Sequence, residues 1–234
     1  MPRCRSSRVA RAGPGEMGDL VLWGAGGHGK VVLDIAKAMG GFKSIVFIDD
    51  ACEPSAREFC DCLVFGASQC LQSLKDKGSS QYLVSIGKNG IRAACFQRAF
   101  EHGLQPVKLV HPSAVISESA RLENGTVVMP RVVINAGARI GKNCILNTAS
   151  VVEHDCRVGD HVHLSPGVLL GGGVTVHSFA HVGIGAIVLP GAEIGEGAVV
   201  GAGSVVLVSV PPGIKVVGNP ARALVKAGKV ASSL

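Results

Sequence analysis

The chain has 234 residues, of which 47% are hydrophobic and only 4% aromatic, and its formal net charge is +6 at pH 7. This length suits one large or two small domains with enough apolar material for a buried core. Basic residues gather near the two ends of the chain, so no basic face is predicted on the body and we expect no nucleic-acid partner.

Residues 1–19 are predicted to form a flexible basic extension, in which Met17 is an alternative start to Met1. This segment has no apolar run, so we expect neither a secretory signal nor a membrane anchor. None of the eight cysteines forms a Cys-x-x-Cys pair, although Cys60-x-Cys62 leaves a ligand site open. We therefore expect reduced thiols in a cytoplasmic protein.

Residues 20–109 carry an alternation of strand and helix patterns. The first elements expected are a strand at 20–23, a glycine loop at 24–29, a helix at 30–39 and a strand at 45–48. Further along we expect a strand at 62–65, a helix at 68–77, a strand at 82–86, a helix at 90–102 and a strand at 106–110. This order predicts a half-sized, Rossmann-like parallel α/β domain.

The glycine loop Gly24-Ala25-Gly26-Gly27-His28-Gly29 follows a strand, opens a helix and precedes the acidic pair Asp49-Asp50 by about twenty residues. Bare backbone amides at such a helix start hold phosphate. The literal interpretation is dinucleotide binding, but half of a Rossmann unit has room for only a mononucleotide, which favours a nucleotide-linked substrate. A structural glycine turn, with His28 an ordinary helix-start residue, stays open.

A six-residue repeat begins after His111-Pro112 marks the domain joint. From Val110 to Val206 every sixth residue is aliphatic, and four residues after each comes a small residue or valine, Cys144 and Cys156 among them. This period fits neither a helix nor an alternating strand. It predicts a parallel β-solenoid over 110–211, with three six-residue sides in each coil, followed by a tail at 212–234.

Polar residues outside the two inward places are predicted to lie on the solenoid surface, and His154, Asp155 and His163 are among them. Because Glu153 and Asp155 flank His154, we expect a neighbouring carboxylate to fix its tautomer and raise its basicity, as a general base requires. We expect His161, His177 and His181 to be solvated side chains. The histidine spacing does not exclude a three-histidine metal site, but no third ligand completes one, so no metal is expected.

The repeat, the glycine loop, the strand end Ile48-Asp49-Asp50, the segment 147–156 and the ending Gly218-Asn219-Pro220-Ala221-Arg222 together resemble the sialic acid O-acetyltransferase-like sugar acetyltransferases. The pattern is most similar to the N-acetyltransferases of nucleotide-linked 4-amino sugars, over nearly all of 20–225. The resemblance implies a left-handed parallel β-helix and a homotrimer with active sites in clefts between neighbouring solenoids. It also implies acetyl-CoA as co-substrate.

The resemblance assigns roles to single residues. It makes His154 the general base, supported by Asp155 where close relatives often carry glutamate, and it suits Asn147 for a supporting hydrogen bond. The implied sugar-nucleotide contacts are Gly26, Gly27, His28, Asp49, Asp50 and Gly87. The implied acetyl-CoA contacts are His163, Gly172, Ile184 and Ala202, with Gly172 near the thioester.

The expected function is direct acetyl transfer from acetyl-CoA to the amino group of a nucleotide-linked 4-amino-4,6-dideoxy sugar. No acyl-enzyme is expected, because the solenoid cysteines point inward. The alternative within enzymes is O-acetylation of sialic acid or another sugar hydroxyl. A non-catalytic scaffold, or an N-terminal domain that senses NAD, is also conceivable, but neither explains Glu153-His154-Asp155.

Overall fold

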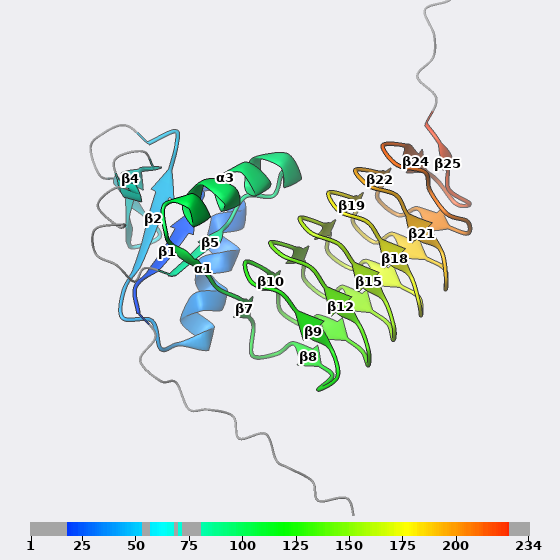
Figure 1. Cartoon of the computed structure of the whole chain (residues 1–234), viewed down its shortest axis with the longest axis horizontal. Helices are drawn as coiled ribbons and strands as arrows, with labels where there is room; N and C mark the ends of the chain where they lie inside the picture. Colours follow the sequence, from blue (N-terminus) through cyan, green and yellow to red (C-terminus); the bar gives the residue numbers. More distant parts are fainter. Residues whose placement is uncertain (1–17, 53–56, 68–69, 72–80, 225–234) are drawn as a thin grey trace, which may run out of the picture.

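A computed structural model describes residues 18–52, 57–67, 70–71 and 81–224. It contains an N-terminal α/β domain and a solenoid that extends away from it (Figure 1). The helix expected at 68–77 lies largely outside the described residues. Within the described part of the chain, no helix is long and apolar enough to cross a membrane.

The α/β domain is built on a six-stranded sheet of order β3-β4-β2-β1-β5-β6. Its strands pair in parallel except for the antiparallel β3–β4 hairpin. The strands are β1 Leu20–Trp23, β2 Ile45–Asp49, β3 Arg57–Phe59, β4 Cys62–Gly66, β5 Gln81–Val84 and β6 Gln105–Pro106. Strand β3 is unexpected, because its sequence Arg-Glu-Phe is short and mostly polar. The single strand expected at 106–110 is divided into β6 and a solenoid strand at Leu109–Val110.

Two described helices accompany this sheet, α1 Gly27–Met39 and α3 Asn89–Glu101. Helix α1 begins inside the glycine loop, three residues before the predicted start. It packs against β1 and also against β7 (Leu109–Val110), which is the first strand of the solenoid. The α/β domain is thus attached to the solenoid by packing as well as by the chain itself.

The solenoid has three faces, each a parallel sheet of short strands paired with the coil before and after, which confirms the six-residue period. Face 1 comprises β7, β10 Val127–Val128, β13 Ile145–Leu146, β16 His163–Leu164, β19 His181–Val182, β22 Val199–Val200, β24 Lys215–Val217 and the antiparallel β25 Arg222–Ala223. Face 2 comprises β8 Val115–Ile116, β11 Val133–Ile134, β14 Val151–Val152, β17 Leu169–Leu170, β20 Ile187–Val188 and β23 Val205–Val206. Face 3 comprises β9 Arg121–Leu122, β12 Arg139–Ile140, β15 Arg157–Val158, β18 Thr175–Val176 and β21 Glu193–Ile194.

The predicted inward positions form the solenoid core. From Val128 to Val206 every aliphatic residue of the repeat is buried, and so are the small residues between them, such as Cys144 and Ala186. In the first coil Val110, Ile116 and Leu122 are only partly buried, because no earlier coil stacks on them. Strand β24 still pairs with β22, so the face 1 sheet continues past residue 211.

The outward residues distinguish the three faces. On face 1 those of the earlier coils are buried beneath the α/β domain and include Val127, Ile145 and His163, whereas the later His181 and Val199 are partly buried and Lys215 is exposed. On face 2 they are aliphatic and partly exposed, whereas face 3 begins with three exposed arginines. The prediction that His163 is a surface group is therefore wrong, because its side chain is only 9% exposed. The repeat separates inside from outside but does not reveal which outer face another domain covers.

Arg92 on α3 joins the two domains. Its side chain is 1% exposed, and its Nη1 donates to the carbonyls of Ile86 and Gly87 in its own domain, both at 3.1 Å. Towards the solenoid, Nε donates to Asn143 O at 2.9 Å and Nη2 to His161 O at 2.7 Å. Burial lowers the pKa of Arg92 to about 10, so the guanidinium is still charged at neutral pH.

We predict that Arg92→Met lowers the free energy of unfolding by about 3 kcal/mol or more, because several buried carbonyls lose their donor. The matched control is Arg98→Met on the same helix. Arg98 pairs with Asp50 at 2.9 Å but is 37% exposed, and its loss should cost less than about 1 kcal/mol. Urea denaturation measures both variants, and equal losses would contradict the joining role of Arg92.

Candidate functional site

His154 lies at the corner between faces 2 and 3, where β14 leads into β15. Its side chain is 64% exposed, and its Nδ1 lies 3.0 Å from Asp155 Oδ2. Asp155 has a left-handed backbone (φ 59°), and its amide donates to Ala136 O of the preceding coil at 2.9 Å. A hydrogen on Nδ1 that is donated to the carboxylate leaves the lone pair of Nε2 free to accept a proton.

Gly172 occupies the same corner one coil further on, directly against the imidazole. A Cβ atom at position 172 would lie 2.5 Å from His154 Nε2 and 2.6 Å from Cε1, so the ring position requires glycine. The neighbouring amide of Gly173 donates to His154 O at 2.9 Å. Within the described chain the Gly172 amide has no acceptor, which leaves a hydrogen-bond donor beside the base.

Asn147 does not contact His154 as expected but bonds to His163 on face 1. Its Nδ2 lies 3.3 Å from His163 Nε2, while His163 Nδ1 lies 3.2 Å from Gly87 O. A neutral ring with its hydrogen on Nδ1 satisfies both contacts, since it donates to Gly87 and accepts from Asn147. Asn147 Oδ1 in turn accepts from the Thr148 amide at 2.8 Å, which fixes the orientation of the Asn147 amide group.

A row of histidines fills the joint between the glycine loop and face 1. The ring centroids of His28 and His163 are 6.4 Å apart, and those of His163 and His181 are 4.8 Å apart. Burial, aided by the charge of Arg92, lowers the pKa of His28 to about 4. His28 Nε2 is buried and has no partner among the described residues. The row therefore holds neutral rings near pH 7.

His161 and His181 were expected to be solvated, but both side chains are half-buried and contact other residues near this joint. His161 stacks on Phe179 with centroids 4.8 Å apart, and His181 Nε2 lies 3.1 Å from Ser165 Oγ. Burial lowers the pKa of both rings. The expectation of solvated rings fails for these two because the α/β domain covers face 1, whereas His177 is 48% exposed as expected.

The glycine loop presents open backbone at the start of α1. Around Gly26 and Gly27 no atom lies within 4 Å of an added Cβ, whereas a Cβ at Gly29 would collide with Gly24 O. The first amides of a helix have no partner within it, so this loop offers donors to an anion. Gly87 lies opposite, in the loop between β5 and α3.

The two predicted acidic contacts are already engaged within the protein. Asp49 Oδ2 accepts from the Ala25 amide at 2.8 Å and so fixes the glycine loop. Asp50 accepts from Trp23 Nε1 at 3.0 Å and from Arg98 at 2.9 Å. Both carboxylates therefore bond to groups of the protein itself, and that of Asp49 stabilises the glycine loop.

The four residues implied to contact acetyl-CoA lie in different places. Ile184 is 61% exposed and Ala202 is exposed; both lie at the corner between faces 1 and 2, where the Gly203 amide donates to Ile184 O. Gly172 lies with His154 at the other corner of face 2, and His163 is buried under the α/β domain. A single chain thus separates the exposed members of this set across face 2.

Nucleophilic and metal chemistry have little support among the described residues. Burial raises the pKa of the Cys144 thiol to about 12 and raises that of Cys156, so these inward cysteines are protonated. No group of three or more His, Cys, Asp or Glu side chains in the described ranges is arranged to hold a metal ion.

We predict that the His163 joint weakens as the pH falls. Burial, with the charges of His181 and Arg92 nearby, lowers the pKa of His163 from 6.5 to about 3. The unfolded chain therefore binds more protons below pH 6.5, and stability present above that pH declines by up to about 1.4 kcal/mol per pH unit for this one ring. His163→Asn should flatten this decline in unfolding measured between pH 7 and 4.5. Parallel pH profiles for the two proteins would contradict the assignment.

Two family models match the chain. The PglD N-terminal domain matches residues 19–99, and the bacterial transferase hexapeptide model, of six repeats, matches residues 137–172. UDP-N-acetylbacillosamine N-acetyltransferase from Bacillus subtilis (strain 168) is 36% identical over 115 residues, which are 48% of this chain and 52% of that protein. The match thus spans about half the length of this curated relative.

Solved structures extend the similarity to both domains. One is a histidine-to-alanine variant of GDP-perosamine N-acetyltransferase from Caulobacter crescentus, solved in complex with CoA and GDP-perosamine. It is 39% identical to this chain with a TM-score of 0.84, and the match covers 90% of this chain and 98% of that chain. The acetyltransferase domain of PglB from Neisseria gonorrhoeae FA1090, in complex with acetyl-CoA, is 38% identical with a TM-score of 0.81 and covers 88% and 98%. The chain therefore belongs to the left-handed β-helix N-acetyltransferases of nucleotide sugars that carry a PglD-type N-terminal domain.

Proposed function

We propose that this protein transfers the acetyl group of acetyl-CoA to the amino group of a nucleotide-linked 4-amino-4,6-dideoxy sugar. The observation that carries the proposal is the exposed imidazole of His154, bonded to Asp155 at Nδ1 and lying on Gly172 at Nε2. The similar Caulobacter structure holds CoA and GDP-perosamine, and the similar Neisseria structure holds acetyl-CoA. The cytoplasm is the proposed location of this reaction.

His154 acts as the general base in this proposal. Nε2 takes the proton of the attacking amine, and the resulting imidazolium is stabilised by Asp155 through Nδ1. The exposed corner admits the amine without moving the backbone. The amine nitrogen bonds to the thioester carbonyl carbon of acetyl-CoA, the C–S bond breaks, and the leaving CoA thiolate takes the proton from His154 Nε2. Transfer is direct because both inward solenoid cysteines are buried thiols.

The backbone amide of Gly172 is the proposed oxyanion donor. It has no acceptor within the described residues, and the corner places it against the imidazole that receives the proton. Gly172 lies in the turn between β17 and β18, and the next amide of that turn is bonded to the preceding coil. An amide held in this way needs no reorganisation when negative charge develops on a carbonyl oxygen nearby. Base and oxyanion donor then lie on consecutive coils of one corner.

The glycine loop and Gly87 hold the sugar nucleotide in this proposal. The open amides near Gly26 and Gly27 suit its phosphates, and the unpartnered Nε2 of His28 offers one more polar contact. The contacts of His163 with Asn147 and Gly87 set the position of the loop between β5 and α3 relative to the solenoid.

The proposed active site is completed by a second copy of the chain in a homotrimer. The corner that carries Ile184 and Ala202 and the corner that carries His154 lie at opposite edges of face 2. Face 2 itself exposes Val115, Leu169 and Ile187, which are 64%, 42% and 36% exposed. An apolar face of this kind favours subunit contact, and that contact brings the two corners of different subunits together.

Acceptor screening tests the reaction and separates it from O-acetylation. The protein is incubated with acetyl-CoA and UDP-, GDP- or dTDP-linked 4-amino sugars, or with sialic acid, and the products are weighed. We expect addition of one acetyl group to an amino sugar nucleotide, stable to mild base as an amide is. Acetylation of sialic acid alone would favour the O-acetyltransferase alternative.

We predict that His154→Ala lowers kcat about 10²–10⁴-fold, because the general base is lost. The matched control is His177→Ala, since His177 is also an exposed solenoid histidine and lies 3.4 Å from Glu193. Steady-state rates with saturating acetyl-CoA measure both variants. A His154→Ala enzyme that keeps more than about a tenth of the activity would falsify the assignment.

We predict that Gly172→Ala lowers kcat by about tenfold or more, because the added methyl group displaces the imidazole by contact with Nε2. Gly90→Ala is the control, because a Cβ at Gly90 meets no atom within 4 Å. The melting temperature of both variants should stay near that of the native protein. An unchanged kcat for Gly172→Ala would mean that the ring does not work in the position observed.

A further inference from the structure

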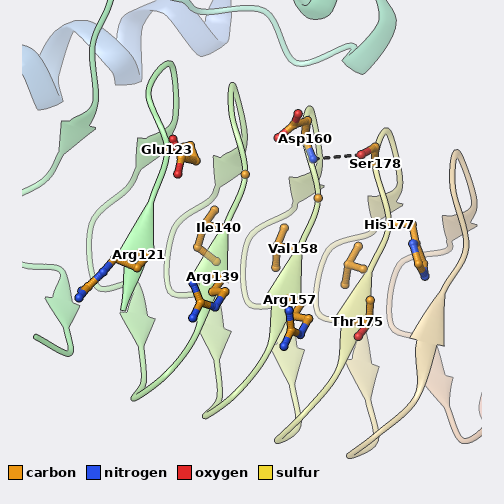
Figure 2. Close-up of a pocket in the computed structure, with 13 residues that line it drawn as sticks. Arg121, Glu123, Arg139, Ile140, Arg157, Val158, Asp160, Thr175, His177 and Ser178 are labelled. Atoms are coloured by element: carbon orange, nitrogen blue, oxygen red, sulfur yellow. Dashed lines mark hydrogen bonds between the residues drawn. The ribbon is translucent and has the colours of Figure 1, made fainter. Parts of the chain in front are cut away.

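Face 3 carries a ladder of three arginines, Arg121, Arg139 and Arg157. They lie in register on β9, β12 and β15, and all three are exposed. Figure 2 shows the three side chains on consecutive coils of one face. Adjacent strands are about 4.8 Å apart, and like charges directly opposite each other on neighbouring strands are destabilising.

No acidic side chain in the described chain neutralises this ladder. Arg121 Nη1 donates to the carbonyls of Glu118 and Ala120 at 3.1 and 3.0 Å. Arg139 and Arg157 have neither a hydrogen-bond nor an ion-pair partner among the described residues. The ladder thus holds positive charge that the rest of the fold leaves unpaired.

Acidic residues lie at both corners of face 3. Glu123 and Asp160 belong to the corner between faces 3 and 1, and Asp160 Oδ1 accepts from the Lys142 amide at 2.7 Å (Figure 2). The arginines lie at the strand starts, on the side of the corner that carries His154. Glu118, Glu153 and Asp155 belong to the corner that carries His154. The ladder therefore lies between two groups of carboxylates, none of which forms an ion pair with it among the described residues.

Two glycines open a hollow beside the ladder. Gly141 and Gly159 follow the inward residues of β12 and β15, at places where neighbouring coils have Glu123 and His177. A Cβ at Gly159 would lie 2.7 Å from the Ser178 amide nitrogen, so the close approach of the next coil keeps this place without a side chain. The hollow has a volume of about 370 Å³ and is lined by all three arginines.

We propose that this ladder is a binding site for a short oligophosphate, that is, two or more linked phosphate groups. One guanidinium group binds two oxygens of a phosphate at once, and three such groups in register can contact neighbouring phosphates of one ligand. The positive strip spans about 10 Å, which is two strand spacings. It ends at Thr175 and then Glu193, whose position in register would repel a longer polyanion. Such a ligand comes from a nucleotide or from CoA, both of which carry diphosphates.

The test is a calorimetric titration of the full chain with inorganic pyrophosphate at low salt, which measures the dissociation constant. We expect Arg139→Gln to weaken binding at least about tenfold, the effect of losing one charge-assisted contact. Arg131→Gln, which removes another exposed arginine of the same solenoid, should leave the affinity unchanged. Parallel titrations with a nucleoside diphosphate and with CoA show which source loses affinity with Arg139.

Several outcomes would overturn the site. One is a failure of pyrophosphate to bind the native chain, and another is an equal loss of affinity in Arg139→Gln and Arg131→Gln. A drop in the melting temperature of ligand-free Arg139→Gln would also contradict it, because removing an unpaired charge from the ladder should not destabilise the fold. His154→Ala serves to separate this site from acetyl transfer, since it should abolish turnover yet leave pyrophosphate affinity unchanged.

Discussion

The buried guanidinium of Arg92 is the contact on which the arrangement of the two domains depends. It ties the loop of Ile86 and Gly87 to carbonyls of the solenoid, and no carboxylate of the described residues pairs with it. A charge buried among carbonyl dipoles is stable only while all of its hydrogen bonds are made. The same loop presents Gly87 O to His163, so the geometry of the histidine row follows from this one side chain. Ser85, at the end of β5, donates to Gly24 O at 2.8 Å and so links the glycine loop to this segment.

The six-residue repeat determines which positions can carry functional side chains. Inward positions of each coil are aliphatic or small, so functional side chains are confined to corners and outer faces. Because coils stack in register, residues eighteen apart become neighbours, and His154 meets Gly172 without any long-range loop. The three faces differ in their outward side chains: face 1 packs against the α/β domain, face 2 is apolar, and face 3 is charged.

Much of this fold could be predicted from the sequence, because the repeat and the β1 to α1 loop are periodic or local signals. The exposed His154 beside Asp155 follows from the same phase. The burial of His163 and its bond to Asn147 could not be predicted, since the repeat does not say which face another domain covers. Arg92 was missed although the pattern contains a signal: it shares the inward face of α3 with Cys95, Phe96 and Ala99, at helical spacing.

The most direct test of the account is a crystal structure of the assembled protein with CoA and the amino sugar nucleotide that it acetylates. The account predicts the sugar amine within about 3 Å of His154 Nε2. We also expect the phosphates of the sugar nucleotide on a glycine loop, and CoA in contact with Ile184 and Ala202 of a different subunit from the one that supplies this histidine. A sugar amine remote from His154 in every subunit would contradict the account.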